Sequence, residues 1–308
     1  MIILNILRFY ISSVYWESKW RAITLGFFGL LGSAWTVVEL IDYFSGDDNY
    51  IPRTFIAFIS IATTSLIISL IINCQKLTFR YKIQSKDINI SLVIGDIFDQ
   101  KADIVISTNT TFDTTTENRF ISPASIQGQL YRYYNKIDHL DSEIENALIG
   151  IEPKEILVRT KTKSRRFPYG TIIKLNHQNF FSYWVAMADV NESGKPSSSF
   201  VILQECLERL WNYILTSGHM DRIAVPILGS GKTGINENRV KLIKEIIFSF
   251  VAFSREKKIT EELVICIHPN DFFSHSIDLE YINKYLEYIC EFGYESKSGE
   301  VQSRGIDI

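Results

Sequence analysis

The segment RIAVPILGSGKTG (Arg222–Gly234) is the clearest indication of the fold class of this 308-residue chain. Its first half is a compact, β-branched apolar run typical of a buried strand, and its second half holds three glycines within six residues. A helical pattern follows from Asn236 to Lys258, and then a further strand-like run, ELVICI, at Glu262–Ile267. A strand, a glycine-rich turn and a helix in this order predict an α/β domain with the turn at the carboxyl end of a strand.

The same alternation extends to both sides of this stretch. We predict further strands at Ile90–Gly95, Ala102–Ser107, Gly170–Leu175 and Phe180–Ala188, and helices at Ser122–Asn135, Asp138–Leu148, Pro196–Ser217 and Asp278–Phe292. The pattern predicts a three-layer α/β/α domain with a mixed sheet over residues 88–295. A short polar linker, 76–87, would precede this domain, and a C-terminal tail, 296–308, would follow it.

Composition excludes several classes of function. The formal net charge is −3, so we expect no nucleic-acid partner. The four cysteines form no CxxC pair, which favours a reducing compartment over a disulfide framework. The five histidines show no spacing typical of metal ligands, so we expect no metal site.

Two uncharged apolar runs lie in the first quarter of the chain. They read AITLGFFGLLGSAWTVV (Ala22–Val38) and TFIAFISIATTSLIISLIINCQ (Thr54–Gln75), and as helices they would be roughly 26 and 33 Å long. A bilayer core is about 30 Å thick, so we predict two transmembrane helices within residues 21–75. The alternative is a pair of buried helices in a soluble fold. Residues 1–20 would form an amphipathic segment on the inner membrane surface or an extra packed helix.

Flanking charges predict the orientation of these helices, because excess Lys and Arg stay on the cytoplasmic side. Basic residues dominate before the first span and after the second, whereas the connecting loop is acidic. We therefore predict a two-pass protein with both termini in the cytoplasm. The residues are Arg8, Lys19 and Arg21 before, Lys76, Arg80, Lys82 and Lys86 after, and Glu39, Asp42, Asp47 and Asp48 with the single Arg53 between.

Small residues within the spans suggest close helix packing. Gly26, Gly29 and Ser33 share a helical face, and Ser65-x-x-x-Ser69 repeats the spacing in the second span. The two helices of one chain could use these residues to pack together, or two chains could use them to associate.

Three predicted loops carry polar chemistry at strand ends. Asp96 follows the first strand, a loop rich in hydroxyls and amides spans Ser107–Thr114, and the glycine-rich loop could cradle phosphate with its backbone N–H groups. The sequence GSGKT imitates a Walker A motif, but GxxxxGK[ST] requires glycine where Pro226 stands. We therefore expect a phosphate cradle without ATP hydrolysis.

In their order and spacing these loops resemble those of macro domains, which bind ADP-ribose. The closer resemblance is to the macro module of Thoeris anti-phage effectors, and it covers Ile88 to Tyr294. It rests on TNTTFDT (Thr108–Thr114), ISPASIQGQL (Ile121–Leu130), PYGTIIKL (Pro168–Leu175), the Asn191-x-x-Gly194 turn, LERLW (Leu207–Trp211) and PILGSGKTG (Pro226–Gly234).

The resemblance implies a role for each loop. Asp96 and the backbone of Ile97 would read adenine, and the glycine-rich loop would wrap the diphosphate. The remaining residues would face the distal ribose, form the opposing lip or stack on the ligand. These site residues are Leu228, Gly229, Ser230, Gly231, Lys232, Thr233 and Gly234 for the diphosphate, Asn109, Thr110, Phe112 and Asp113 for the distal ribose, Ser125, Gln127 and Gly128 for the lip, and Phe272 for stacking.

Ordinary structural roles are the alternatives. Asp96 could cap a strand end, Asp113 could form a turn, and Lys232 could be a solvated loop charge. The basic run RTKTKSRR (Arg159–Arg166) would be a solvated segment or, alternatively, a binding site for lipid phosphates.

The resemblance implies a membrane effector of the bacterial inner membrane and not an enzyme. It would bind an ADP-ribose derivative, such as histidine–ADP-ribose made by a TIR-domain enzyme that consumes NAD, without a cofactor, and it would form homo-oligomers that disrupt the bilayer. Catalytic macro hydrolases carry an NAAN-like turn and a glycine triplet, but this chain reads STNT at Ser107–Thr110 and FDTTTENRF at Phe112–Phe120. A membrane-tethered ADP-ribosyl hydrolase with Asp113 as base is the alternative.

Overall fold

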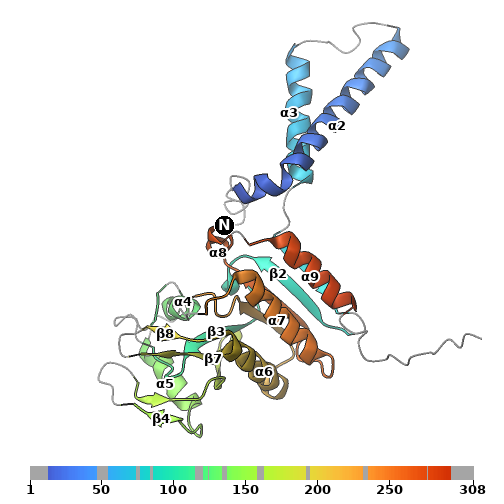
Figure 1. Ribbon diagram of the computed structural model, residues 1–308. Coiled ribbons are helices and arrows are strands. Elements are labelled where there is room, and N and C mark those ends of the chain that lie inside the picture. Colours follow the sequence, from blue (N-terminus) through green and yellow to red (C-terminus); the bar gives the residue numbers. More distant parts are fainter. Residues whose placement is uncertain are drawn as a thin grey trace, which may run out of the picture. The chain divides into compact units, whose positions relative to one another are not determined.

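The structure, a computed structural model, has two compact units, Met1–Leu77 and Thr78–Ile308 (Figure 1). The tail 296–308, Lys232, Thr233 and Gly234 of the glycine-rich loop, and residues 1–12 of the expected amphipathic segment lie outside the described residues. The described residues are 13–46, 55–73, 77–83, 86–114, 121–123, 125–133, 137–157, 163–191, 195–231, 235–275 and 277–292.

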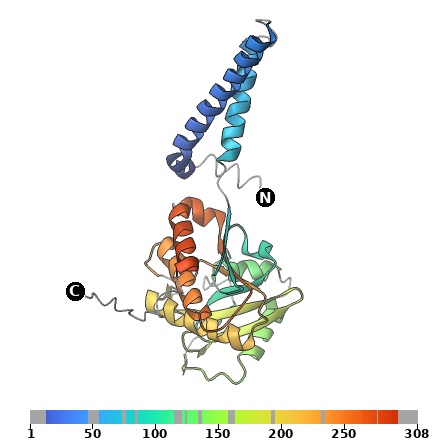
Figure 2. The ribbon, with the colours of Figure 1, turned by 90° about the vertical axis from the view of Figure 1, so that its right-hand side faces the viewer.

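Two helices, α2 (Ser13–Ser45) and α3 (Phe55–Ile72), make up the described part of the first unit and lie side by side (Figures 1 and 2). Both are long and apolar enough to cross a membrane. Their apolar side chains are largely exposed, Leu25 at 75% and Ile56 at 77%. A core helix of a soluble protein would bury such residues, so this exposure favours lipid as their surroundings. Because α2 begins at Ser13, part of the segment expected to be separate belongs to the first long helix.

The small residues of the two helices divide into two groups. Ser65 and Ser69 are buried, and Ser69 Oγ donates a hydrogen bond of 2.8 Å to the carbonyl of Ile23. A Cβ atom at Gly26 would lie 2.7 Å from Ser69 Oγ, so glycine is what permits this approach. Gly29, by contrast, faces open space. Packing within one chain therefore uses Gly26 and the two serines, and leaves Gly29 exposed.

The second unit is built on an eight-stranded mixed sheet, which confirms the expected α/β fold with a mixed sheet. The strand order is β1-β2-β10-β9-β3-β7-β6, and β8 pairs with β7. The strands from β2 to β7 in this order run parallel, whereas β1, β6 and β8 pair antiparallel with their neighbours. The bounds are β1 Thr78–Lys82, β2 Asn89–Ile94, β3 Asp103–Asn109, β6 Ile172–His177, β7 Phe180–Val190, β8 Pro196–Ser197, β9 Arg222–Pro226 and β10 Glu262–Ile267; β4 (Glu155–Ile156) and β5 (Arg165–Arg166) form a separate pair.

Helices cover both faces of this sheet (Figures 1 and 2). Ile104 and Ile106 of β3 join one core, which includes residues of α4 and α5, whereas Val105 between them faces the opposite side, because strand side chains alternate. The helices are α4 (Ile126–Tyr133) and α5 (Ile137–Ala147) on one face, and α6 (Phe200–Ser217), α7 (Arg239–Ser254) and α9 (Leu279–Phe292) on the other; the short helices η1 (Ile97–Gln100) and α8 (Pro269–Ser274) follow β2 and β10.

Helix caps and apolar spacing explain the start of α6. The Ser199 hydroxyl accepts a hydrogen bond from Ile202 N at 3.3 Å, and apolar residues at helical spacing, from Leu203 to Ile214, are buried. The helix thus begins at Phe200 and not at Pro196, whose segment pairs with β7 as β8.

The prediction of a linker over residues 76–87 is wrong in part, because residues 78–82 form the edge strand β1. The strand pairs antiparallel with β2, and Arg80 bonds to the buried Glu262 at 3.2 Å. Its side chains are only partly buried, which is why the segment reads as polar. A fragment that starts at residue 80 would remove part of the sheet.

The buried His177, at the end of β6, should make the stability of the fold depend on pH. Burial lowers the pKa of this imidazole to about 4 from the ordinary 6.5. Because the unfolded state binds the proton first, the stabilisation by the neutral ring is complete above pH 6.5 and is lost as the pH falls toward 4. We expect the melting temperature of the wild-type chain to fall more between these values than that of His177→Gln, measured by circular dichroism in detergent. Equal slopes would contradict the prediction.

Candidate functional site

A cavity of about 770 Å³ opens where the parallel strands end. The carboxyl ends of β2, β3, β9 and β10 meet at one edge of the sheet, so the residues that follow these strands line one space. Its size suits a nucleotide-sized or drug-sized ligand. Eight of the residues expected at a binding site line it: Asp96, Ile97, Asn109, Ser125, Gln127, Gly229, Ser230 and Gly231.

Asp96 has a structural role and also lies on the cavity. Its Oδ1 accepts a hydrogen bond of 3.0 Å from Phe98 N and so caps η1. Among the described residues Oδ2 has no hydrogen-bond partner. The helix cap therefore leaves one carboxylate oxygen available, and the two roles considered for Asp96 are compatible.

The glycine-rich loop turns sharply at Gly229, whose φ is +82°. Ser230 N donates to the carbonyl of Ile227 at 3.1 Å, which closes the turn. Within the part of the chain that the structure describes, the N–H groups of Leu228 and Gly231 have no acceptor. A loop with unpaired N–H groups beside a cavity is suited to bind an anion. The Leu228 side chain itself is buried and does not line the cavity.

Three residues expected to face a ligand point elsewhere: Thr110, Phe112 and Asp113 are buried off the cavity. Phe112 has φ +50°, and its ring packs against Phe167 with the centroids 5.7 Å apart. Thr110 Oγ1 donates to Asp189. The backbone of the turn aims these side chains into the core, and the sequence alone could not indicate this.

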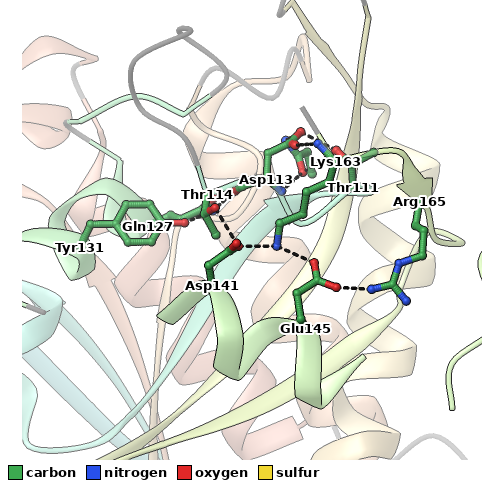
Figure 3. Close-up of polar contacts among 10 residues, drawn as sticks. Thr111, Asp113, Thr114, Gln127, Tyr131, Asp141, Glu145, Lys163 and Arg165 are labelled. Carbon is green, nitrogen blue, oxygen red and sulfur yellow. Dashed lines mark hydrogen bonds and ion pairs between the residues drawn. The ribbon is translucent and has the colours of Figure 1, made fainter. Parts of the chain in front are cut away.

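Asp113 is the centre of a polar network that includes the cavity-lining Gln127 (Figure 3). Its Oδ2 accepts from Asn109 Nδ2 at 3.0 Å and from Thr111 Oγ1 at 2.5 Å, and its Oδ1 accepts from Lys163 N at 3.0 Å. Gln127 Nε2 donates to the Asp113 carbonyl at 2.8 Å. Asp113 thereby positions two residues that line the cavity, Asn109 and Gln127, and does not reach it itself.

The described end of the basic run is paired with carboxylates. Lys163 Nζ lies 2.6 Å from Asp141 and 2.9 Å from Glu145, and Arg165 also pairs with Glu145 (Figure 3). Arg166 pairs with Glu155. These pairs leave residues 163–166 little free positive charge for lipid phosphates.

Gly128, expected in the lip, and Phe272, expected to stack on the ligand, both lie off the cavity. Gly128 does not line the cavity but permits a close turn, because a Cβ there would lie 2.3 Å from the carbonyl of Ser122. This turn delays α4 to Ile126, later than the predicted Ser122. Phe272 is buried against Phe273 and does not cover the cavity.

The cavity is also lined by residues that the sequence analysis did not name as site residues, among them Arg239, Asp271, Ser274 and His275. Arg239 begins α7, and Asp271, Ser274 and His275 come from α8 and the residue after it. The run HPNDFF directly after the last strand was the available signal, because residues at that position reach the same edge of the sheet.

Cys266 also lines the cavity, but it is not a reactive nucleophile. Burial raises the pKa of its thiol to about 12, so it stays protonated at neutral pH. The described residues contain no group of three side chains that could hold a metal.

Thr108 offers a test of the cavity wall. It lines the cavity, is 4% exposed, and its Oγ1 has no hydrogen-bond partner among the described residues. A buried, unpaired hydroxyl costs about 1–3 kcal/mol, so Thr108→Val should raise the free energy of unfolding by about 1 kcal/mol. Thermal unfolding measures this, with Thr108→Ser as the control that keeps the hydroxyl. A less stable valine variant would contradict the prediction.

This architecture, a mixed sheet between helices with a glycine-rich loop at the cavity, is that of a macro domain. The family model described as "Thoeris protein ThsA, Macro domain" matches residues 90–268, more than half of the chain, and the chain belongs to this family.

A curated relative is also similar to part of this chain. It is Thoeris protein ThsA of Bacillus amyloliquefaciens (strain Y2), which is 28% identical over 190 residues; the match covers 58% of this chain and 61% of the relative. Among solved structures, the Oceanobacillus iheyensis macrodomain with ADP has a TM-score of 0.47 at 14% identity, covering 69% of this chain and 96% of that one. The Trypanosoma brucei macrodomain in complex with ADP-ribose has a TM-score of 0.42 at 14% identity, covering 66% and 70%.

Proposed function

We propose that this protein is a membrane effector of bacterial anti-phage defence that binds an ADP-ribose-type nucleotide in its macro domain. One observation carries the proposal: a single cavity joins Asp96, Asn109 and the glycine-rich loop. Membership of the ThsA macro family supports it.

The cavity lining matches the parts of such a ligand. The free Oδ2 of Asp96 can accept a hydrogen bond from the exocyclic amine of adenine. The N–H groups of Leu228 and Gly231 can donate to a diphosphate, which the bare backbone near Gly231 lets approach closely. Ser125 and Gln127 lie with Asn109 on the same cavity and suit a distal ribose or a group attached to it.

Binding without hydrolysis is our preferred proposal. Asp113, the carboxylate named as a general base, lies off the cavity, and both of its oxygens accept hydrogen bonds. A base must reach the attacking water. Incubation of the chain with ADP-ribosylated protein tests the alternative, because release of free ADP-ribose would support a hydrolase.

The signal would come from a TIR-domain enzyme that converts NAD into an ADP-ribose derivative such as histidine–ADP-ribose. In this proposal α2 and α3 cross the bacterial inner membrane with both termini in the cytoplasm. The ligand binds the self-associated form more tightly and so shifts the population toward oligomers that disrupt the bilayer.

Calorimetry on the full chain in lipid nanodiscs tests ligand binding directly. We expect ADP-ribose or its histidine conjugate to bind, and NAD to bind more weakly. Leakage of dye from vesicles that carry the full chain, with and without ligand, tests the membrane step. Absence of binding by every ADP-ribose derivative would refute the sensor role.

A further inference from the structure

Arg239 stands out among the residues on the cavity. It is the only Lys or Arg side chain among the described residues that line it, whereas Asp96 and Asp271 contribute two carboxylates. Arg239 is the first residue of α7, whose cap is Asn238, and this fixes where its side chain starts. Within the described lining, a ligand with two negative charges would meet this guanidinium as its one permanently cationic side-chain partner.

Two contacts hold the guanidinium at the junction of the glycine-rich loop and α8. Nη2 donates to the carbonyl of Ser230 at 2.7 Å, and Nε donates to Asp271 Oδ1 at 3.3 Å. Asp271 Oδ1 also lies 2.9 Å from His275 Nδ1. Within the described residues Nη1 has no acceptor, so Arg239 can donate to a further anion without losing either contact.

We propose that Arg239 recognises the diphosphate of the ligand and that Asp271 limits the strength of this recognition. The inference rests on the proposed function and adds a selectivity to it: the site prefers nucleotides that carry a diphosphate over neutral nucleosides. The backbone N–H groups of the loop bind the phosphates, and Nη1 adds a charge-assisted hydrogen bond, which is stronger than a neutral one. No backbone group can replace this charge.

The two members of the ion pair therefore have opposite effects on binding. Loss of the Arg239 charge removes an attraction to the diphosphate. Loss of the Asp271 charge removes a repulsion, and it also removes the competitor for the same guanidinium. If the pair were only structural, loss of either member would weaken the site in the same way.

The experiment compares two ligands on full-length variants in nanodiscs. ADP-ribose carries the diphosphate, whereas adenosine lacks it. Adenosine binding is measured by ligand-observed NMR. We expect Arg239→Gln to weaken ADP-ribose binding at least about tenfold, or about 1.4 kcal/mol, and to leave adenosine binding within about twofold. Asp271→Asn should strengthen ADP-ribose binding about threefold. The matched control Arg239→Lys keeps the charge and should fall between wild type and Arg239→Gln.

Salt provides an independent readout, because it screens charge. ADP-ribose binding by the wild-type chain should weaken more with added salt than binding by Arg239→Gln. Equal losses for Arg239→Gln and Asp271→Asn, or an unchanged ADP-ribose affinity in Arg239→Gln, would overturn the inference alone. Failure of the wild-type chain to bind ADP-ribose would overturn the proposed function together with it.

Discussion

A Gly231→Glu variant is expected to fold normally and to lose ADP-ribose binding by at least about a hundredfold, or about 2.7 kcal/mol. A Cβ at Gly231 meets no atom within 4 Å, and its φ is not among the positive values, so a side chain can be accommodated. The new carboxylate would lie beside N–H groups proposed to bind the diphosphate. Two like charges about 4 Å apart repel by about 4 kcal/mol at an effective dielectric constant of about 20.

A matched control separates the effect of the added charge on ligand affinity from the effect of the added side-chain volume. Gly231→Gln has nearly the same size and no charge, so most of its affinity should remain, as measured by calorimetry on the full chain. Gly229→Ala gives a second comparison, because its positive φ and a Cβ only 2.6 Å from Ile235 would distort the turn itself. In cells, full toxicity of the Gly231→Glu variant upon infection would count against signal binding by this loop.

An Asp113→Ala variant is expected to lose about 3–5 kcal/mol of unfolding free energy. The carboxylate is buried and accepts three hydrogen bonds, from Asn109, Thr111 and the backbone N–H of Lys163 (Figure 3). Alanine leaves all three donors without this acceptor in a place that water does not reach. Chemical denaturation of the full chain in detergent measures the loss.

Asp141 supplies the control, because it belongs to the same network but its side chain is 42% exposed. Its partner Lys163 keeps Glu145 when Asp141 is replaced, so Asp141→Ala should cost under about 1 kcal/mol. An Asp113→Ala variant with unchanged stability and altered turnover of ADP-ribosylated substrates would instead favour a catalytic role for this residue.

Local pattern was enough to predict the central sheet. In β10 all six residues are buried, and the five after Glu262 form an unbroken apolar run, because a parallel strand inside a sheet is covered on both faces. The same reasoning identified α2 and α3, whose long uncharged runs need no tertiary context. Local pattern did not predict the edge strand β1, because an edge strand with partly exposed side chains has the composition of a linker.

Sequence patterns alone predicted which loops follow parallel strands, and hence that Asp96, Asn109 and Gly229–Gly231 would share a cavity. The direction in which each side chain points, in contrast, became apparent only from the folded chain. Phe112 faces the core because its backbone is left-handed at that residue, which no composition reveals. Arg239 and Asp271 lie 32 residues apart and meet because each follows one of two neighbouring parallel strands, β9 and β10. Strand adjacency is a property of the folded sheet, and no local pattern encodes it.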